Sequence, residues 1–167
     1  MNQPFPNRCT RFRTGFTGQV SLVHLFWGAF DLAVTRFSGR KAPPHPGGIP
    51  TIPVEVMPEA FSQEVSSAGC WLGSPDSPEA AFCSYCYPTL KAFREHRAQP
   101  PGAYDHKNPG EFVLPYNTVR QSPDPDEMLM LFLQTAYEAA ATAGHWSRTT
   151  LEKALSYLQK PNPGATQ

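Results

Sequence analysis

The most apolar stretch of the chain, residues 20–40, has a period that fits two kinds of structure. Read as a helix, it gathers its large apolar side chains on one face and its small and polar ones on another. Read as strands, Leu32 and Val34 alternate with Asp31 and Thr35, after a break at a glycine. Its many β-branched and aromatic residues, with glycine inside and at the end, favour extended structure. We therefore predict strands here.

Three further segments have the pattern of strands. Residues 60–71 and 80–87 are joined by a connection rich in Gly, Ser and Pro, so we expect an antiparallel hairpin. Residues 111–116 form a shorter strand, and Pro115 places its end at an edge or a bulge. Alternation along 80–87 separates two faces, with Phe82, Ser84 and Cys86 on one and Cys83, Tyr85 and Tyr87 on the other.

The last third of the chain has the clearest helix signals. Asp124, a proline and Glu127 form an N-terminal capping sequence, and apolar residues then recur at three- and four-residue spacing as far as Gly144. A second helix should begin after Ser147 and stop before Pro161. Together with the strands, these helices predict an α+β fold. It would be an antiparallel sheet of about four to five strands with two C-terminal helices packed on one face.

The other segments are predicted to be mostly irregular. Residues 1–19 look like an extended lead-in, and residues 90–97 like a short helix. The prolines and glycines of residues 41–58 exclude a helix or a central strand, so we interpret this segment as a surface connection, with a lid over a site as the alternative. We expect a single domain over 1–160 and a disordered tail at 161–167.

Charge and composition exclude several classes of partner. The 167 residues carry 14 basic and 14 acidic side chains, which leaves no electrostatic footprint for nucleic acid or an anionic membrane. No apolar run approaches the roughly 20 residues that span a bilayer. The N-terminus has no apolar signal region, so we expect a cytoplasmic protein whose four cysteines are reduced thiols.

Ionisable residues are embedded in the aromatic stretch. Asp31 beside Arg36 or Arg40 is either an acid next to an anion-binding guanidinium or half of a structural ion pair, and the sequence supports both interpretations equally. His24 fits a hydrogen-bonded core histidine better than a catalytic base.

Two glutamates lie within strands that are otherwise small, aromatic and apolar. Glu64 and Glu111 either face solvent, which is the more common arrangement, or point inward. If they point inward together with Tyr85 and Trp71, they would line a pocket suited to hydrogen-bonding a small ligand.

Cys83 and Cys86 have the spacing of a CxxC motif, but they lie in a predicted strand. Residues three apart on a strand point to opposite faces, and no second pair completes a tetrahedral zinc site. The chain also has no phosphate-binding loop and no nucleophile elbow. We therefore predict no metal site and no cofactor.

The chain resembles a known family at a series of collinear positions between about residues 12 and 150. These are Val23-His24, Phe26-Trp27-Gly28, Phe30 to Arg40, Ser62, Glu64, Ser66, Ala68-Gly69, Trp71, Tyr85, Tyr87-Pro88, Glu111-Phe112, Leu114-Pro115-Tyr116, Phe132-Leu133-Gln134 and Tyr137 to Ala140. The pattern resembles the DUF5996 family of uncharacterised, mainly bacterial proteins. The resemblance supplies no catalytic residues, because the family has no assigned function. It implies that this chain corresponds to the C-terminal half of longer members.

Two hypotheses of function follow. The first is a small-molecule-binding protein or enzyme with a pocket on the sheet, in which Asp31 or Glu64 is the acid or base and arginines grip an anionic group. Its ligand-binding residues would be His24, Trp27, Arg36, Arg40, Trp71, Tyr85, Tyr87 and Glu111. The second is a non-catalytic interaction module whose sheet face docks the missing N-terminal half or another subunit, as in a homo-oligomer.

Overall fold

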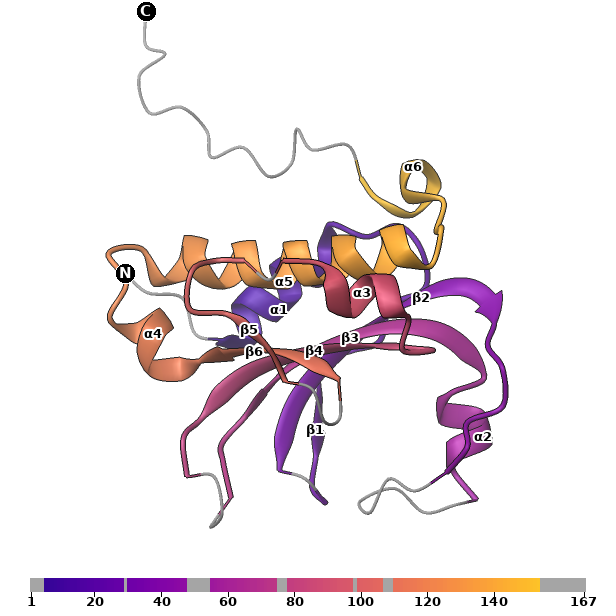
Figure 1. Ribbon diagram of the computed structural model, residues 1–167, viewed down its shortest axis with the longest axis horizontal. Helices are drawn as coiled ribbons and strands as arrows, with labels where there is room; N and C mark the ends of the chain where they lie inside the picture. Colours follow the sequence, from indigo (N-terminus) through magenta and orange to yellow (C-terminus); the bar gives the residue numbers. More distant parts are fainter. Residues whose placement is uncertain are drawn as a thin grey trace, which may run out of the picture.

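In the part of the chain that the structure describes, six strands form one antiparallel sheet (Figure 1). The structure is a computed structural model that describes residues 5–28, 30–47, 55–74, 78–97, 99–106 and 110–153. The order across the sheet is β1-β2-β3-β4-β6-β5, and every neighbouring pair is antiparallel. The strands are β1 (His24–Phe26), β2 (Asp31–Lys41), β3 (Gln63–Trp71), β4 (Ala81–Tyr87), β5 (Tyr104–His106) and β6 (Glu111–Pro115).

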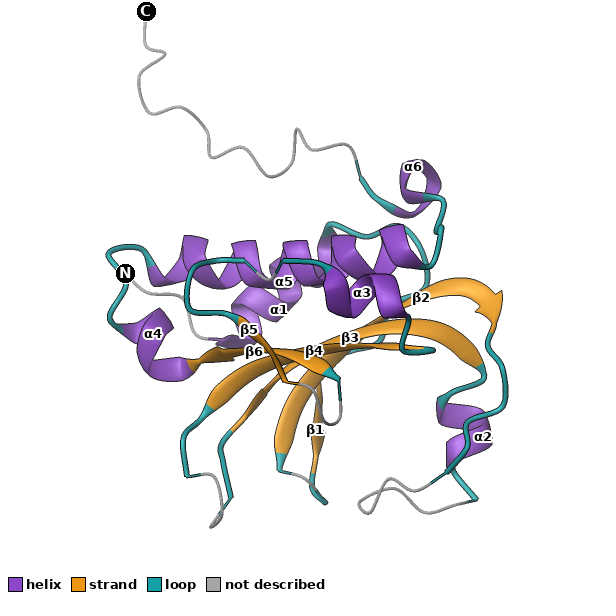
Figure 2. Ribbon diagram, in the orientation of Figure 1, coloured by secondary structure: helices purple, strands orange, loops and turns teal. Residues whose placement is uncertain are grey.

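Helices cover one side of this sheet (Figure 2). The long helix α5 begins at a cap in which the Asp124 side chain accepts a hydrogen bond from the Glu127 backbone N–H at 3.0 Å, as the capping sequence predicts. It lies on the same side of the sheet as α1 and α3 (Figure 1). The described helices are α1 (Phe5–Thr14), α2 (Met57–Ala60), α3 (Lys91–Glu95), α4 (Tyr116–Arg120), α5 (Pro125–Ala143) and α6 (Arg148–Leu151).

Alternation along the strands gives the sheet two different faces. The register pairs Val34 with Ala68, Ala68 with Ser84 and Ser84 with Phe112. Val34, Ala68 and Phe112 belong to the apolar core that the helices cover, so the even-numbered residues of these strands form the helix face. We call the opposite side the open face. It consists of the odd-numbered residues of β2 up to Phe37 and of β3, β4 and β6, of Lys41, which pairs with Gln63, and of the even-numbered residues of β1 and β5.

A connection without regular structure lies over one end of the open face. The Tyr87 hydroxyl donates a hydrogen bond to the Pro43 carbonyl oxygen at 2.8 Å. The His45 ring stacks on Phe61 with centroids 4.4 Å apart and lies 5.0 Å from the Tyr87 ring. Tyr87 is therefore held in place by contacts within the protein.

Gly69 lies where β2 and β3 approach closely. A Cβ atom at Gly69 would lie 2.6 Å from the Leu32 carbonyl oxygen and 3.2 Å from the Ala33 Cβ. The first of these atoms belongs to the backbone, so any larger residue would force the two strands apart. Gly69 pairs with Ala33 on one side and with Cys83 on the other, which keeps the side chains small in the middle of the open face.

The α+β prediction is confirmed, with six described strands in place of four or five. The stretch at 20–40 forms strands, and the predicted strands at 60–71, 80–87 and 111–116 are all present. The additional strand is β5, whose 3 residues are too few to show a period in the sequence.

The predicted extended lead-in at 1–19 is wrong for residues 5–14, which form α1. Cys9, Phe12 and Phe16 are buried in the core at helical spacing. Their signal is obscured in the sequence by the prolines and arginines around them.

Near the C-terminus, α6 begins after Ser147 as predicted, and its Leu151 packs against the core. The rest of the predicted second helix, the tail at 161–167 and residues 48–54 of the predicted connection lie outside the described residues. Residues 42–47 are irregular as predicted. The exclusion of a helix is wrong at the end of the connection, where Met57 and Pro58 begin α2, because a proline is tolerated in the first turn of a helix. Among the helices described, none is long and apolar enough to cross a membrane.

Candidate functional site

Side chains of the three central strands form rows across the open face. Pairing of odd-numbered residues in the β2–β3–β4 register brings together positions that are far apart in the sequence. The hydroxyl oxygens of Thr35 and Ser67 lie 2.9 Å apart and share a hydrogen bond. Three neighbouring rows differ in chemistry: one carries hydroxyl groups, the middle one small side chains, and the third an acid and an indole. The rows are Thr35–Ser67–Tyr85, Ala33–Gly69–Cys83 and Asp31–Trp71–Ala81.

Two half-buried carboxyl groups belong to this face, Asp31 on β2 and Glu111 on β6. Burial raises the pKa of Asp31 above its ordinary value, and a backbone hydrogen bond opposes this change. Burial also raises the pKa of Glu111; His106 opposes the rise and the charge of Asp31 adds to it. Both carboxyl groups therefore hold a proton more readily than an exposed carboxyl group does.

Among the described residues of the open face, neither carboxylate has an arginine or lysine partner, and the histidine beside Glu111 is His106. Among its positions in the six described strands, Lys41 is the one Arg or Lys, and it pairs with Gln63 at the end of β2 opposite to Asp31. Among the described residues, neither Asp31 nor Glu111 forms an ion pair. Carboxyl groups with raised pKa values cluster at functional sites, so this pair marks the open face as a candidate site.

Tyr85 and Cys83 lie between the two carboxyl groups along the sheet. Burial raises the pKa of Tyr85, a hydrogen bond with Ser67 opposes the rise, and the charges of Asp31 and Glu111 add to it. Burial likewise raises the pKa of the Cys83 thiol, and Glu111 is the next largest cause. Cys83 is thus a protonated thiol and a weak nucleophile, and Tyr85 is a neutral hydrogen-bond donor.

Glu64 and Arg40 lie together on the helix face. The Glu64 Oε2 atom accepts hydrogen bonds from Arg40 Nη2 at 2.6 Å and from Trp146 Nε1 at 2.9 Å. Arg40 also donates to the carbonyl oxygen of Gly144. These contacts join β2 and β3 to the end of α5, which gives Glu64 and Arg40 a structural role.

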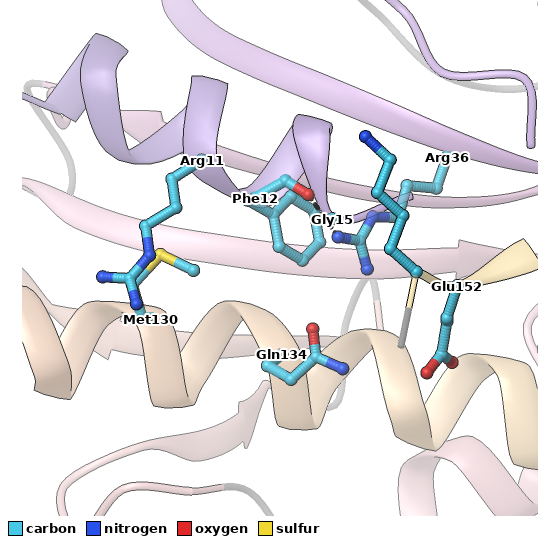
Figure 3. Close-up of a pocket in the computed structure, with 8 residues that line it drawn as sticks. Arg11, Phe12, Gly15, Arg36, Met130, Gln134 and Glu152 are labelled. Atoms are coloured by element: carbon cyan, nitrogen blue, oxygen red, sulfur yellow. Dashed lines mark hydrogen bonds between the residues drawn. The ribbon is translucent and has the colours of Figure 1, made fainter. Parts of the chain in front are cut away.

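Arg36 is buried beneath the helices, with 2% of its side chain exposed. Its guanidinium Cζ lies 3.5 Å from the ring centre of Phe12, 4.3 Å from that of Tyr137 and 5.1 Å from that of Phe16. It donates a hydrogen bond to the Phe12 carbonyl oxygen (Figure 3). Burial lowers the pKa of Arg36 to about 10, and Tyr137, Glu152 and Glu138 oppose the change.

The structure thus divides the predicted site residues between two faces. Neither Arg36 nor Arg40 pairs with Asp31, because these residues point to opposite sides of β2. Trp27 lies in the turn between β1 and β2, where it is 78% exposed and its ring centre is 6.1 Å from that of Phe30. The predicted residues on the open face are His24, Asp31, Trp71, Tyr85, Tyr87 and Glu111, and those on the helix face are Arg36, Arg40 and Glu64.

The CxxC pair is separated as the strand alternation predicts. Cys83 belongs to the open face and Cys86 to the apolar core, and both are free thiols. The described part of the chain contains no group of three or more side chains that could hold a metal ion.

Three polar residues of the open face, Thr35, Ser67 and His106, were not among the predicted site residues. Thr35 and Ser67 alternate with helix-face residues on β2 and β3, so the strand period was the signal that could have identified them. His106 lies on the short strand β5, where it pairs with Glu111, and no period marks it in the sequence.

The chain matches the family model described as a family of unknown function, DUF5996, over residues 6–153. No curated protein and no solved structure matches it. The match covers most of the 167 residues, and the chain therefore belongs to the DUF5996 family.

Proposed function

We propose that this protein binds a small organic ligand on the open face of its sheet, and that the ligand is a cation or a donor of several hydrogen bonds. The observation that carries the proposal is the pair of half-buried carboxyl groups, Asp31 and Glu111, neither of which has an Arg or Lys partner among the described residues. A bound cation would supply the missing countercharge and lower both raised pKa values.

The aromatic residues of the same face support a ligand of this class. Trp71 pairs directly with Asp31 in the β2–β3 register, and Tyr85 is 37% exposed next to the row of small side chains. An ammonium or guanidinium group over an aromatic ring is attracted to the face of the ring, by about 0.5–2 kcal/mol depending on desolvation. The carboxylates and the rings would therefore act on the same charge.

Catalysis at this face would use the raised pKa values. A carboxyl group whose pKa lies nearer to neutrality can donate a proton to a ligand and take one back, which suits Asp31 or Glu111 to general acid–base work.

The free cysteines fit a protein that works in a reducing compartment, and we propose the cytoplasm as its location.

The test is a thermal-shift screen of the full chain with a panel of primary amines, guanidines and neutral amides. A ligand that binds the folded protein raises its melting temperature, and the rise grows with the logarithm of the ligand concentration once that concentration exceeds Kd. Asp31→Asn and Glu111→Gln should each weaken binding by about tenfold, because each removes one charge-assisted contact. Glu59→Gln, at an exposed position of α2, is the matched control and should leave Kd unchanged.

The Trp71 fluorescence offers a second measurement of the same event. A ligand at Asp31 should quench or shift the emission, and Trp71→Phe should abolish that signal while Kd changes little. Binding that survives in the Asp31→Asn, Glu111→Gln double variant would rule the open face out as the site.

A second candidate function rests on the hairpin between β1 and β2. Leu25, Phe26, Trp27 and Phe30 are 41%, 52%, 78% and 50% exposed, and β1 is an edge strand of the sheet. Clustered exposed apolar side chains mark interaction surfaces, and an edge strand can pair with another strand. His24 is the sole ionisable residue among residues 22–30, so pairing with a second copy of this chain would meet no charge repulsion.

Sedimentation of the full chain across a range of concentrations distinguishes this candidate from the first. Association that Trp27→Ser with Phe30→Ser abolishes would support a homodimer through β1. A monomer at every concentration would exclude it and would leave the ligand proposal untouched.

A further inference from the structure

A small cavity lies between α1, α5 and β2, on the helix face and away from the open face (Figure 3). Its volume is about 20 Å³, enough for a water molecule or one end of a small anion. It is lined by three cationic side chains, Arg11, Arg36 and Lys153, and by one carboxylate, Glu152. The side chain of Gln134 also reaches this space.

Arg36 is the buried wall of this cavity, and its hydrogen bonding is incomplete. The guanidinium donates to the Phe12 carbonyl oxygen, but its Nε has no hydrogen-bond partner among the residues that the structure describes. The rings of Phe12 and Tyr137 lie against the guanidinium and attract its charge. They do not accept hydrogen bonds from the N–H groups that point outward in the guanidinium plane.

The acids near Arg36 are already bound to another arginine. Arg148 lies 2.9 Å from Glu138 and 2.5 Å from Glu152, so both carboxylates have a cationic partner at contact distance. They oppose the fall in the pKa of Arg36 only as charges at a distance. Arg36 is 2% exposed and contacts no carboxylate of the described residues, which is an unfavourable arrangement for a guanidinium unless something else supplies negative charge.

We propose that this cavity is a binding site for a small oxyanion, either inorganic phosphate or a carboxylate group, held by Arg36 from within and by Arg11 and Lys153 at the opening. The oxyanion accepts the unused N–H groups of Arg36 and provides its countercharge. The carboxylate of Glu152 is the unfavourable neighbour, and its pairing with Arg148 limits the repulsion.

The direct test observes Arg36 itself in the full chain. In ¹⁵N-correlated NMR spectra the Arg36 Nε–H signal, assigned through its bonds, should shift saturably when sodium phosphate or sodium acetate replaces sodium chloride at constant ionic strength. A shift with phosphate alone identifies a phosphate site, and one with acetate alone a carboxylate site. No saturable shift with either anion would overturn the proposal and would leave a water molecule as the occupant.

Variants test the same site through the melting temperature. Arg36→Gln should raise Kd for the anion about tenfold or more, since it removes a charge-assisted hydrogen bond from a buried position. Lys153→Gln at the opening should raise Kd about two- to fivefold, as expected for an exposed charge pair. This substitution leaves the core intact, so it still tests the site if Arg36→Gln fails to fold. The control is Lys91→Gln on α3, which does not line the cavity. An equal response of the wild type, Lys153→Gln and Lys91→Gln would also overturn the proposal.

Discussion

At the scale of single residues, the parity of a position on its strand decides which face a charge occupies. Asp31 and Arg36 are five residues apart on β2 and therefore point to opposite faces. The sequence shows this parity for each strand by itself. It does not show the register between strands, so the pairing of Asp31 with Trp71 and of Arg40 with Glu64 could be obtained only from the structure.

Glu64 was predicted as an acid or base, and in the structure one of its oxygens accepts hydrogen bonds from two residues, Arg40 and Trp146. We expect Glu64→Ala to lower the free energy of unfolding by about 1–3 kcal/mol, because Trp146 Nε1 loses its acceptor at a buried position and Arg40 loses its partner. Urea unfolding measures the change. Glu95→Ala, which breaks an exposed pair with Lys91, should alter stability by about 0.5 kcal/mol or less. Equal effects of the two substitutions would contradict a structural role for Glu64.

At the scale of elements, the sequence predicts best where a capping signal and a long period coincide. α5 has both, and it begins one residue after its predicted cap, Asp124. α1 has the period of Cys9, Phe12 and Phe16, but its first residues carry no acidic side chain to mark the start. The length of an element and the clarity of its ends, more than its apolar content, decided which predictions were right.

The N-cap residues of α5 and α6, Asp124 and Ser147, can be compared directly. Asp124→Ala should destabilise the protein by about 1 kcal/mol, because the Glu127 N–H loses its side-chain acceptor. Ser147, at the start of α6, makes no such bond, so Ser147→Ala should have little effect. Thermal and urea unfolding of both variants measure the difference. Unchanged stability of Asp124→Ala would mean that the α5 cap is not a source of stability.

At the scale of the whole molecule, the open face makes stability depend on pH. The folded protein holds protons on Asp31 and Glu111 more tightly than the unfolded chain does, because both pKa values are raised. The stability from these two groups is therefore fully present below their unfolded pKa values, about 4, and is lost as the pH rises through the folded values.

Asp31→Asn and Glu111→Gln cannot ionise, so each should be more stable than the wild type at neutral pH. The difference should vanish near pH 3, where the wild-type carboxyl groups are protonated in both states. Urea midpoints at the two pH values measure this, with Glu59→Gln as the control at an exposed position. A wild type that is more stable than both variants at pH 7 would contradict the raised pKa values.

The placement of α1, α3 and α5 on a single side of the sheet bears on how this family can change over time. Replacing a buried helix-face residue such as Phe112 removes core packing, typically at about 3–5 kcal/mol. Replacing partly exposed Asp31, Tyr85 or Glu111 leaves that packing intact and typically alters stability far less. The open face can thus accept substitutions while the helix face preserves the fold, and Gly69 is the position on the open face that must stay small.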